Sequence, residues 1–254
     1  MWFDSHCHLQ IVEEETALGS VLERAREAGV DDLVTVGIDV PSSRRVLDIA
    51  LSHELHAAVG IHPNSAGEFS KAAMDEIASL AQDPHVVGIG ESGLDFYRDH
   101  AAPEAQAVAF EAHIDLAVAS GKTLIIHTRS SMDAALETLE RHDVVPRTIF
   151  HCWSGDVNQL RRALELGAYV SFAGNVSFKS AEDLREAARA VPMDRLLIET
   201  DSPYLAPVPH RGKPNEPALV ADVGAAAAAA RGNSVDEVAQ ATTANARAIF
   251  GLDP

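Results

Sequence analysis

The sequence predicts a closed (β/α)8 barrel, with an open doubly wound sheet as the alternative. Eight short apolar or β-branched runs alternate with segments of helical periodicity along the whole chain. Such alternation is typical of parallel strands connected by helices. The 254 residues match the usual length of one barrel, and no linker or low-complexity tract divides them. We therefore expect a single domain over residues 1–254.

Each predicted strand is a short run of β-branched or large apolar residues. The eight runs are Trp2–Asp4, Leu33–Val36, Leu55–Val59, Val86–Ile89, Thr123–His127, Thr148–His151, Tyr169–Phe172 and Leu196–Glu199. The segments between them repeat apolar residues at helical spacing, and several end at a glycine, as helices commonly do. The predicted helices are Ala17–Ala28, Ser42–Ser52, Lys71–Ala81, Ala105–Ser120, Met132–Arg141, Val157–Leu166 and Glu182–Ala190.

The segment after the last predicted strand is rich in proline, which forbids regular structure and predicts a long ordered loop. Its prolines are Pro203, Pro207, Pro209, Pro214 and Pro217. Residues 218–250 then predict one helix that breaks near Gly232 and a second that Ser234 and its neighbours cap.

Composition and charge limit the possible functions. The chain is 46% apolar and 23% charged, which is ordinary for a globular protein with a sizeable core. Lys and Arg number 20 against 38 Asp and Glu, so the formal charge of -18 argues against a broad DNA-binding surface. A nucleic-acid substrate would have to be held by bound cations and a local cluster of basic residues. We expect such binding to be weak and salt-sensitive.

Two cysteines, Cys7 and Cys152, do not make a disulfide framework. By strand alternation both should point towards the helices as small core residues. We find neither a secretory signal nor an apolar stretch of membrane-spanning length, since the run Ala225–Ala230 is too short. We therefore expect a cytoplasmic protein.

Metal-binding residue types gather at the ends of the predicted strands. In an extended strand alternate side chains share a face, so Asp4, His6 and His8 are expected to project together. Parallel barrels carry their active sites at the carboxyl ends of the strands. The residues expected there are His6, His8, His62, Glu91, His127, Arg129, His151, Glu199 and Asp201.

Six of these residues are the candidate ligands, and they exceed the needs of one catalytic ion. Two divalent ions that share a carboxylate are the natural solution. Imidazole and carboxylate suit Zn, Mn, Fe or Ni better than Mg. The ligands would be His6, His8, Glu91, His127, His151 and Asp201.

Other residues leave two readings open. His62 precedes Pro63, so it could fix a turn or serve the reaction. Trp153, Phe96 and Tyr97 follow predicted strands and could pack at the barrel rim or bind a base or sugar. We expect the isolated histidines to be surface or capping residues, namely His53, His56, His85 and His142.

The motifs FDSHCHL, GIHP, GESGLDFYR, QAVAFEAHIDLA, IIHTR, FHCWSG and IETDSPYLAPVPHRGKPNEP resemble those of the TatD family of metal-dependent hydrolases and deoxyribonucleases, in order from Phe3 to Pro217. The resemblance implies a TIM barrel of the amidohydrolase type that hydrolyses DNA phosphodiesters with divalent metals. It also implies that Glu91 bridges two ions. One ion would be bound by His6, His8 and Asp201, and the other by His127 and His151. The chain departs from the family at Ser92 and at Lys213–Pro214.

The resemblance, taken with these residues, implies a 3'-5' exonuclease in which a metal-bound hydroxide attacks phosphorus in weakly bound single-stranded DNA, and we expect a monomer. Asp201 is the candidate general base and Arg129 the candidate phosphate clamp, while His62 would donate to the leaving oxygen or orient the substrate. Asp4 is expected to orient a ligand, and Glu199 to do so or to bind a further ion. Further phosphate contacts are expected from Arg98, Arg211 and Lys213.

Three alternatives remain at this point. The same metal site could serve a small-molecule amide or ester hydrolase, which the acidity of the chain favours. It could also serve a hydrolase of aminoacyl-tRNA esters. A non-catalytic metal-binding scaffold is the third, but no candidate ligand or base is missing from the sequence.

Overall fold

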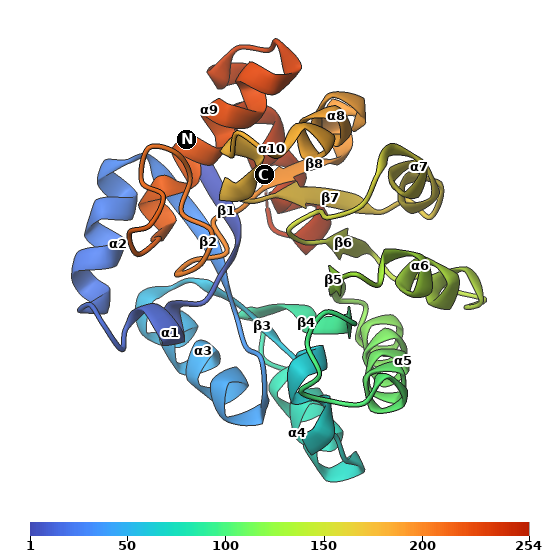
Figure 1. Ribbon diagram of the computed structural model, residues 1–254. Coiled ribbons are helices and arrows are strands. Elements are labelled where there is room, and N and C mark those ends of the chain that lie inside the picture. Colours follow the sequence, from blue (N-terminus) through green and yellow to red (C-terminus); the bar gives the residue numbers. More distant parts are fainter. Residues whose placement is uncertain (254) are drawn as a thin grey trace.

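Eight parallel strands follow one another in chain order around the centre of the molecule, and helices surround them (Figure 1). The computed structural model describes residues 1–253. Every strand pairs in parallel with the next one, so the predicted barrel is confirmed. The strands are β1 (Trp2–Cys7), β2 (Val30–Val36), β3 (His56–Val59), β4 (Val86–Asp95), β5 (Thr123–Arg129), β6 (Thr148–Phe150), β7 (Tyr169–Phe172) and β8 (Leu196–Ile198).

The predicted helices are present, together with a short α1 and four 3-10 turns that the sequence pattern did not predict. The α-helices are α1 (Leu9–Val12), α2 (Leu18–Glu27), α3 (Val40–His53), α4 (Lys71–Leu80), α5 (Pro103–Ser120), α6 (Met132–Glu140), α7 (Val157–Glu165), α8 (Glu182–Ala190), α9 (Val220–Arg231) and α10 (Val235–Phe250). The 3-10 turns are η1 (Pro63–Glu68), η2 (Gly174–Ser177), η3 (Met193–Arg195) and η4 (Pro217–Leu219). Ser234 caps α10 as expected, because its hydroxyl accepts from the backbone N–H of Glu237. Among residues 1–253, no helix combines the length and apolarity needed to cross a bilayer.

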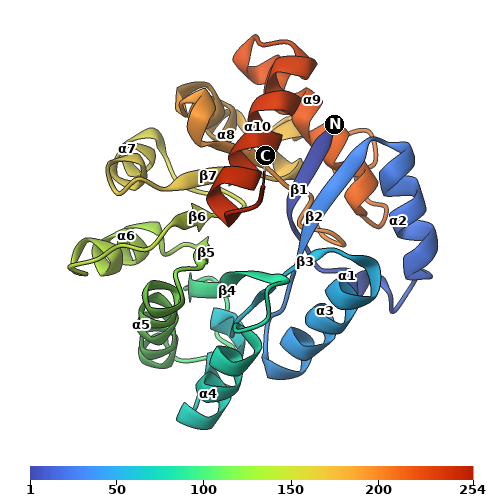
Figure 2. The same ribbon diagram turned by 180° about the vertical axis from the view of Figure 1, so that it is seen from behind.

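The apolar residues form two layers. Along β2, Val34 and Val36 belong to one buried cluster and Leu33 to another, as alternation along a strand requires. The first cluster fills the barrel with side chains from seven strands and α10, and the second lies between strands and helices. Figure 2 shows α10 across one end of the barrel, where Phe250 stacks on Phe3 with ring centroids 6.1 Å apart. The opposite end carries the polar residues.

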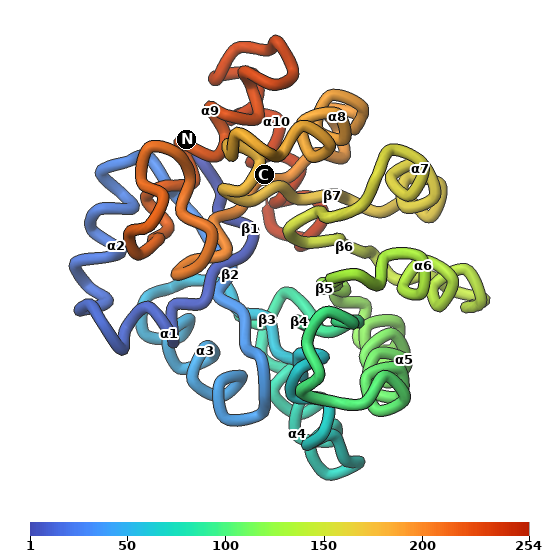
Figure 3. Tube along the Cα trace, viewed as in Figure 1, coloured from blue at the N-terminus to red at the C-terminus, as the bar shows by residue number. Residues whose placement is uncertain are grey.

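The proline-rich loop after β8 is ordered, as expected. It passes beside α2, where the backbone trace shows it in orange (Figure 3). The guanidinium of Arg24 on α2 donates to both carboxylate oxygens of Glu216, at 2.8 and 3.0 Å from Nε. Asn215 is buried, and its side-chain amide donates to the carbonyl oxygens of Thr200 and Tyr204 at 2.8 and 2.5 Å. These contacts fix the segment that contains Asp201.

The prediction that Asp4 shares the face of His6 and His8 is wrong. Asp4 pairs with Leu33 and Cys7 with Thr35, so β1 advances three residues where β2 advances two. This bulge places Asp4 on the same side as Cys7. The Asp4 carboxylate accepts from the backbone N–H and the hydroxyl of Thr200, at 2.8 and 2.6 Å, where β1 approaches the chain beyond β8.

Candidate metal centre

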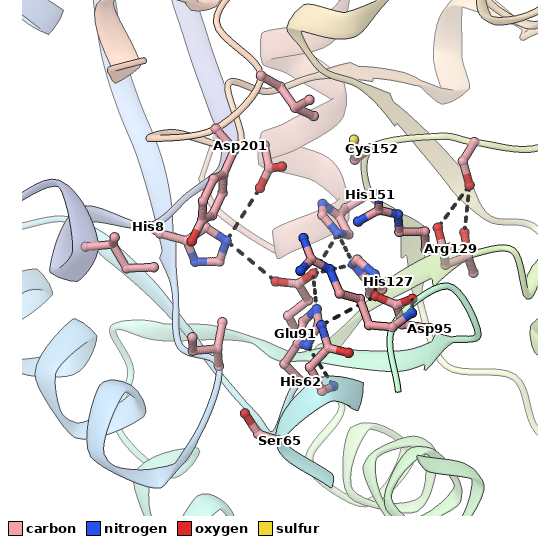
Figure 4. Close-up of a pocket in the computed structure, with 18 of the residues that line it drawn as sticks. His8, His62, Ser65, Glu91, Asp95, His127, Arg129, His151, Cys152 and Asp201 are labelled. Atoms are coloured by element: carbon pink, nitrogen blue, oxygen red, sulfur yellow. Dashed lines mark hydrogen bonds and ion pairs between the residues drawn. The ribbon is translucent and has the colours of Figure 1, made fainter. Parts of the chain in front are cut away.

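The predicted ligands meet at the carboxyl ends of the strands around a cavity of about 640 Å³. Five of them line it, and the sixth, His6, lies fully buried beside them. They come from both sides of the barrel, as Figure 4 shows, with His8 and Asp201 opposite His127 and His151. The seam between β1 and β8 carries two of these residues, because the backbone N–H of Asp201 donates to the carbonyl of His6 at 2.9 Å.

Glu91 lies at the centre, and its two oxygens face different groups of histidines. Its Oε2 is 3.4 Å from His6 Nε2 and 3.6 Å from His8 Nε2. Its Oε1 is 2.7 Å from His127 Nδ1 and 2.8 Å from His151 Nε2. The two oxygens of one carboxylate therefore face two different pairs of nitrogen donors.

The first set includes a second carboxylate. The Nε2 atoms of His6 and His8 are 3.3 Å apart, and Asp201 Oδ1 lies 3.5 Å from the latter and 3.9 Å from the former. Asp201 has a left-handed backbone with φ of 54°, a conformation that Asp tolerates better than most residues. Such uncommon conformations cluster at functional sites.

Two of the imidazoles, those of His8 and His151, are held by an acceptor on the other ring nitrogen, and a third faces a carboxylate. His8 Nδ1 lies 2.8 Å from the carbonyl of Val36, and His151 Nδ1 lies 3.1 Å from the carboxylate of Glu199. His127 Nε2 faces Asp95 Oδ2 at 3.6 Å. Partners of this kind fix ring orientation in metal sites.

Asp95 also belongs to the site, although it was not among the predicted site residues. It lies four residues after Glu91 on β4, and alternate residues of a strand share a face. Its position in the segment GESGLD therefore contained a usable signal. The Asp95 carboxylate also accepts from the backbone N–H groups of Tyr97 and Arg98, at 2.9 and 3.0 Å, which fixes it at the start of the loop after β4.

The donor set fits divalent cations. His6 and His8 direct ring nitrogens at each other within 3.3 Å, as do His127 and His151 within 3.2 Å. Burial opposes charge on these rings, yet the carboxylates of Glu91 and Glu199 raise the pKa of His151 well above its usual value. The surrounding histidines in turn hold the pKa of Glu91 well below its usual value, despite its burial. Clustered nitrogens around ionised carboxylates are an environment that bound cations stabilise.

His62 and Arg129 also line the cavity, as predicted. The Nδ1 of His62 accepts from the backbone N–H of Asn64 at 3.0 Å. The neutral ring therefore carries its hydrogen on Nε2, which points at Glu91 Oε1 from 3.4 Å. Arg129 ends β5, and its guanidinium carbon lies 3.9 Å from the ring centroid of Tyr97.

Of the other predicted phosphate contacts, Arg98 lines the cavity, whereas Arg211 and Lys213 do not. The histidines predicted to be isolated do not line the cavity. Three of them instead face carboxylates elsewhere, namely His56 with Asp32, His85 with Asp83 and His142 with Glu111.

The two cysteines differ. Cys7 packs in the layer between strands and helices, which confirms its prediction. The prediction for Cys152 is wrong, because this residue lines the cavity. The chain leaves β6 at Phe150 and turns left-handed at Cys152, with φ of 44°, so strand alternation no longer applies.

Trp153 is a packing residue, only 1% exposed, with its indole N–H donating to the carbonyl of Gly155.

Known proteins match this chain over nearly its whole length. A family model described as TatD related DNase matches residues 3–251. The uncharacterized metal-dependent hydrolase TatD of Mycobacterium tuberculosis is 39% identical over 257 residues, which cover 98% of this chain and 97% of that protein. The 3'-5' ssDNA/RNA exonuclease TatD of Klebsiella pneumoniae is 34% identical over 240 residues, which cover 92% and 91%. The crystal structure of YJJV, a TatD homologue from Escherichia coli, has a TM-score of 0.92 at 30% identity and covers 99% of this chain and 98% of that one.

Proposed function

Because the chain belongs to the TatD family of metal-dependent hydrolases, we propose that it is a 3'-5' exonuclease that degrades single-stranded DNA. The central observation is that one oxygen of Glu91 faces His6 and the other faces His127. Two arginines, Arg98 and Arg129, line the same cavity. The name of the Klebsiella pneumoniae relative supports the choice of nucleic acid. We propose that the protein acts as a monomer of one domain.

Two divalent ions would be bound by the residues that face Glu91. His6, His8 and Asp201 would hold one, and His127 and His151 the other, with Glu91 shared between them. When bound, such ions lower the pKa of a water molecule and neutralise charge on phosphoryl oxygens.

Asp201 is proposed as the general base. Its carboxylate stands at the open side of the first donor group and lines the cavity. Burial alone would raise its pKa, but the hydrogen bond from His8 and the charges of nearby histidines lower it below the usual value. The carboxylate therefore stays ionised near neutral pH and is able to take a proton from the attacking water.

Arg129 and His62 are proposed to bind the substrate. Arg129 presents planar N–H groups that match two phosphate oxygens, as a bidentate clamp requires. His62 carries its hydrogen on Nε2, the nitrogen directed at Glu91 in the metal centre, and this N–H is proposed to donate to the leaving oxygen or to orient the substrate.

Elemental analysis and an assay with 3'- and 5'-labelled single-stranded DNA test this proposal. About two ions per chain and stepwise shortening from the 3' end are expected. Asp201→Asn should lower kcat by about 100-fold or more, because general-base catalysis contributes roughly that much. Asp236→Asn, at an exposed aspartate of α10 on the far side of the barrel, is the matched control. Full turnover by Asp201→Asn would remove this residue as the base.

The acidity of the chain favours one alternative, a hydrolase of small amides or esters. A hydrolase of aminoacyl-tRNA esters is the other alternative on the same metal site. A panel of phosphodiester, amide and ester substrates distinguishes these reactions. Two bound ions with intact DNA and rapid cleavage of an amide or ester would replace the nuclease with one of these alternatives.

A further inference from the structure

Two aromatic side chains stand exposed beside the metal centre. Phe96 is 45% exposed and Tyr97 is 65% exposed, in contrast to the buried Trp153. They follow β4 directly, where the Asp95 carboxylate accepts from the backbone N–H of Tyr97 at 2.9 Å. The side chain of Gln106 binds both the N–H and the carbonyl of Asp95. These aromatics are thus held at the rim without being packed into the core.

Tyr97 also positions an arginine. The guanidinium of Arg129 stacks on its ring at 3.9 Å, which leaves the N–H groups at the edge of that plane available. Within residues 1–253 neither Arg129 nor Arg98 forms an ion pair, although Arg45 and Arg162 do. Two guanidinium groups therefore line the cavity without an ion-pair partner among these residues, despite the formal charge of -18.

Phe96 lines two hollows of the surface. A hollow of about 500 Å³ shares Ser154 with the central cavity and is lined by Phe96. A second, of about 400 Å³, shares Asp95 and Arg98 with the central cavity and is also lined by Phe96. A chain that extends from the metal centre into either hollow would contact Phe96.

We propose that Phe96, Tyr97 and Arg129 form a subsite for the nucleotide next to the scissile phosphate of a single-stranded polynucleotide. The subsite rests on the proposed nuclease function. Its aromatic rings stack on the base, and the arginine edge binds the phosphate. Stacking accepts any base, so the subsite has little sequence preference. It takes only unpaired nucleotides, because a base inside a duplex already has both faces stacked.

The first test compares a single-stranded decanucleotide with bis(p-nitrophenyl) phosphate, a small diester that needs only the central cavity. Phe96→Ala should raise KM for the decanucleotide by about tenfold, since one stacked base contributes roughly that factor or more. Its kcat and its hydrolysis of the small diester should stay near those of the wild type. Phe96→Tyr should restore the low KM, and Val235→Ala, at an exposed apolar residue of α10, is the control. Unchanged KM in Phe96→Ala, or an equal loss on both substrates, would overturn the subsite.

A second test separates this proposal from the nuclease function. Fluorescence anisotropy measures binding of a labelled oligothymidylate to Asp201→Asn, with and without Tyr97→Ala or Phe96→Ala. Weaker binding in the aromatic variants supports the subsite, even if the wild type cleaves no DNA. A lack of cleavage would refute only the nuclease function. Equal binding in all variants refutes the subsite, whatever the wild type cleaves. Tighter binding of duplex than of single strands also refutes it.

Discussion

His113 on α5 should make the stability of the fold depend on pH. It is fully buried, and its Nε2 accepts from the backbone N–H of Ile61 at 3.0 Å while Nδ1 faces the carbonyl of Ala109 at 2.6 Å. Only the neutral ring can accept the first bond, because an imidazolium has no acceptor. Burial lowers the pKa of His113 from 6.5 to about 4. Ile61 precedes His62, so this contact supports the turn at the edge of the metal centre.

The sign and size of the effect follow from the two pKa values. The folded-state pKa lies below the unfolded one, so the unfolded chain binds more protons between them and the stability falls as the pH drops from 6.5 towards 4. The whole loss is about 3 kcal/mol, of which about 2 kcal/mol falls between pH 7 and pH 5.

Urea unfolding at these two pH values, with a chelator present, measures the effect in wild type and His113→Gln. Glutamine keeps a donor and an acceptor but does not titrate, so the variant should lose about 2 kcal/mol less than the wild type on acidification. Other titrating groups are common to both proteins and cancel in the comparison. His100→Gln, at an exposed histidine, should follow the wild type. Parallel pH profiles for all three proteins would refute the reasoning.

Three further changes test the supports of the metal centre. Glu199→Gln removes the charge that faces His151 Nδ1 from 3.1 Å and should weaken metal binding by about 10-fold or more. Competition with a chelator measures this, and unchanged affinity would contradict the orienting role. Asn215→Ala removes two buried hydrogen bonds and should lower the free energy of unfolding by about 2 kcal/mol in urea, whereas a loss near zero would show that water replaces them. Gly93→Ala would place a Cβ 2.2 Å from the carbonyl oxygen of His127 at a residue with φ of +133°, so it should lower both the metal content and the melting temperature. Wild-type values for both would exclude the clash.

The sequence predicted the strands well where both faces are buried, because such strands are apolar throughout. It failed at the end of β4, which was predicted to stop at Ile89 and continues to Asp95. The residues between include Glu91 and two glycines, a composition typical of a loop. Their pairing with β5, from Ser92 with Ile126 to Asp95 with Arg129, comes from the tertiary structure and leaves no mark in the local pattern.

The ligands could be predicted because they lie at the ends of strands, a place that the order of the elements reveals. Their partners were harder to assign. Cys152 faces the cavity only because its backbone turns left-handed, and no residue type in FHCWSG requires that conformation. Phe96 and Tyr97 follow β4 much as Trp153 follows β6, so their sequence positions do not separate them. Only the structure shows that Phe96 and Tyr97 are exposed at the rim and that Trp153 is buried.

The strands β1 and β4, which carry His6 and Glu91, each contain a bulge at these ligands. Between Asp4 and Cys7 β1 has one residue more than β2, and between Ile89 and Ser92 β4 has one more than β5. Such bulges change the direction of side chains and are common near active sites. Asp4 points towards the helices, so regular alternation along β1 would point His6 towards the helices as well. The bulge instead turns it to within 3.4 Å of Glu91, which itself occupies the second bulge. An alternating sequence pattern does not reveal where a strand contains an extra residue. The residue types of this site are therefore predictable from the sequence, whereas the directions of their side chains depend on how neighbouring strands pair.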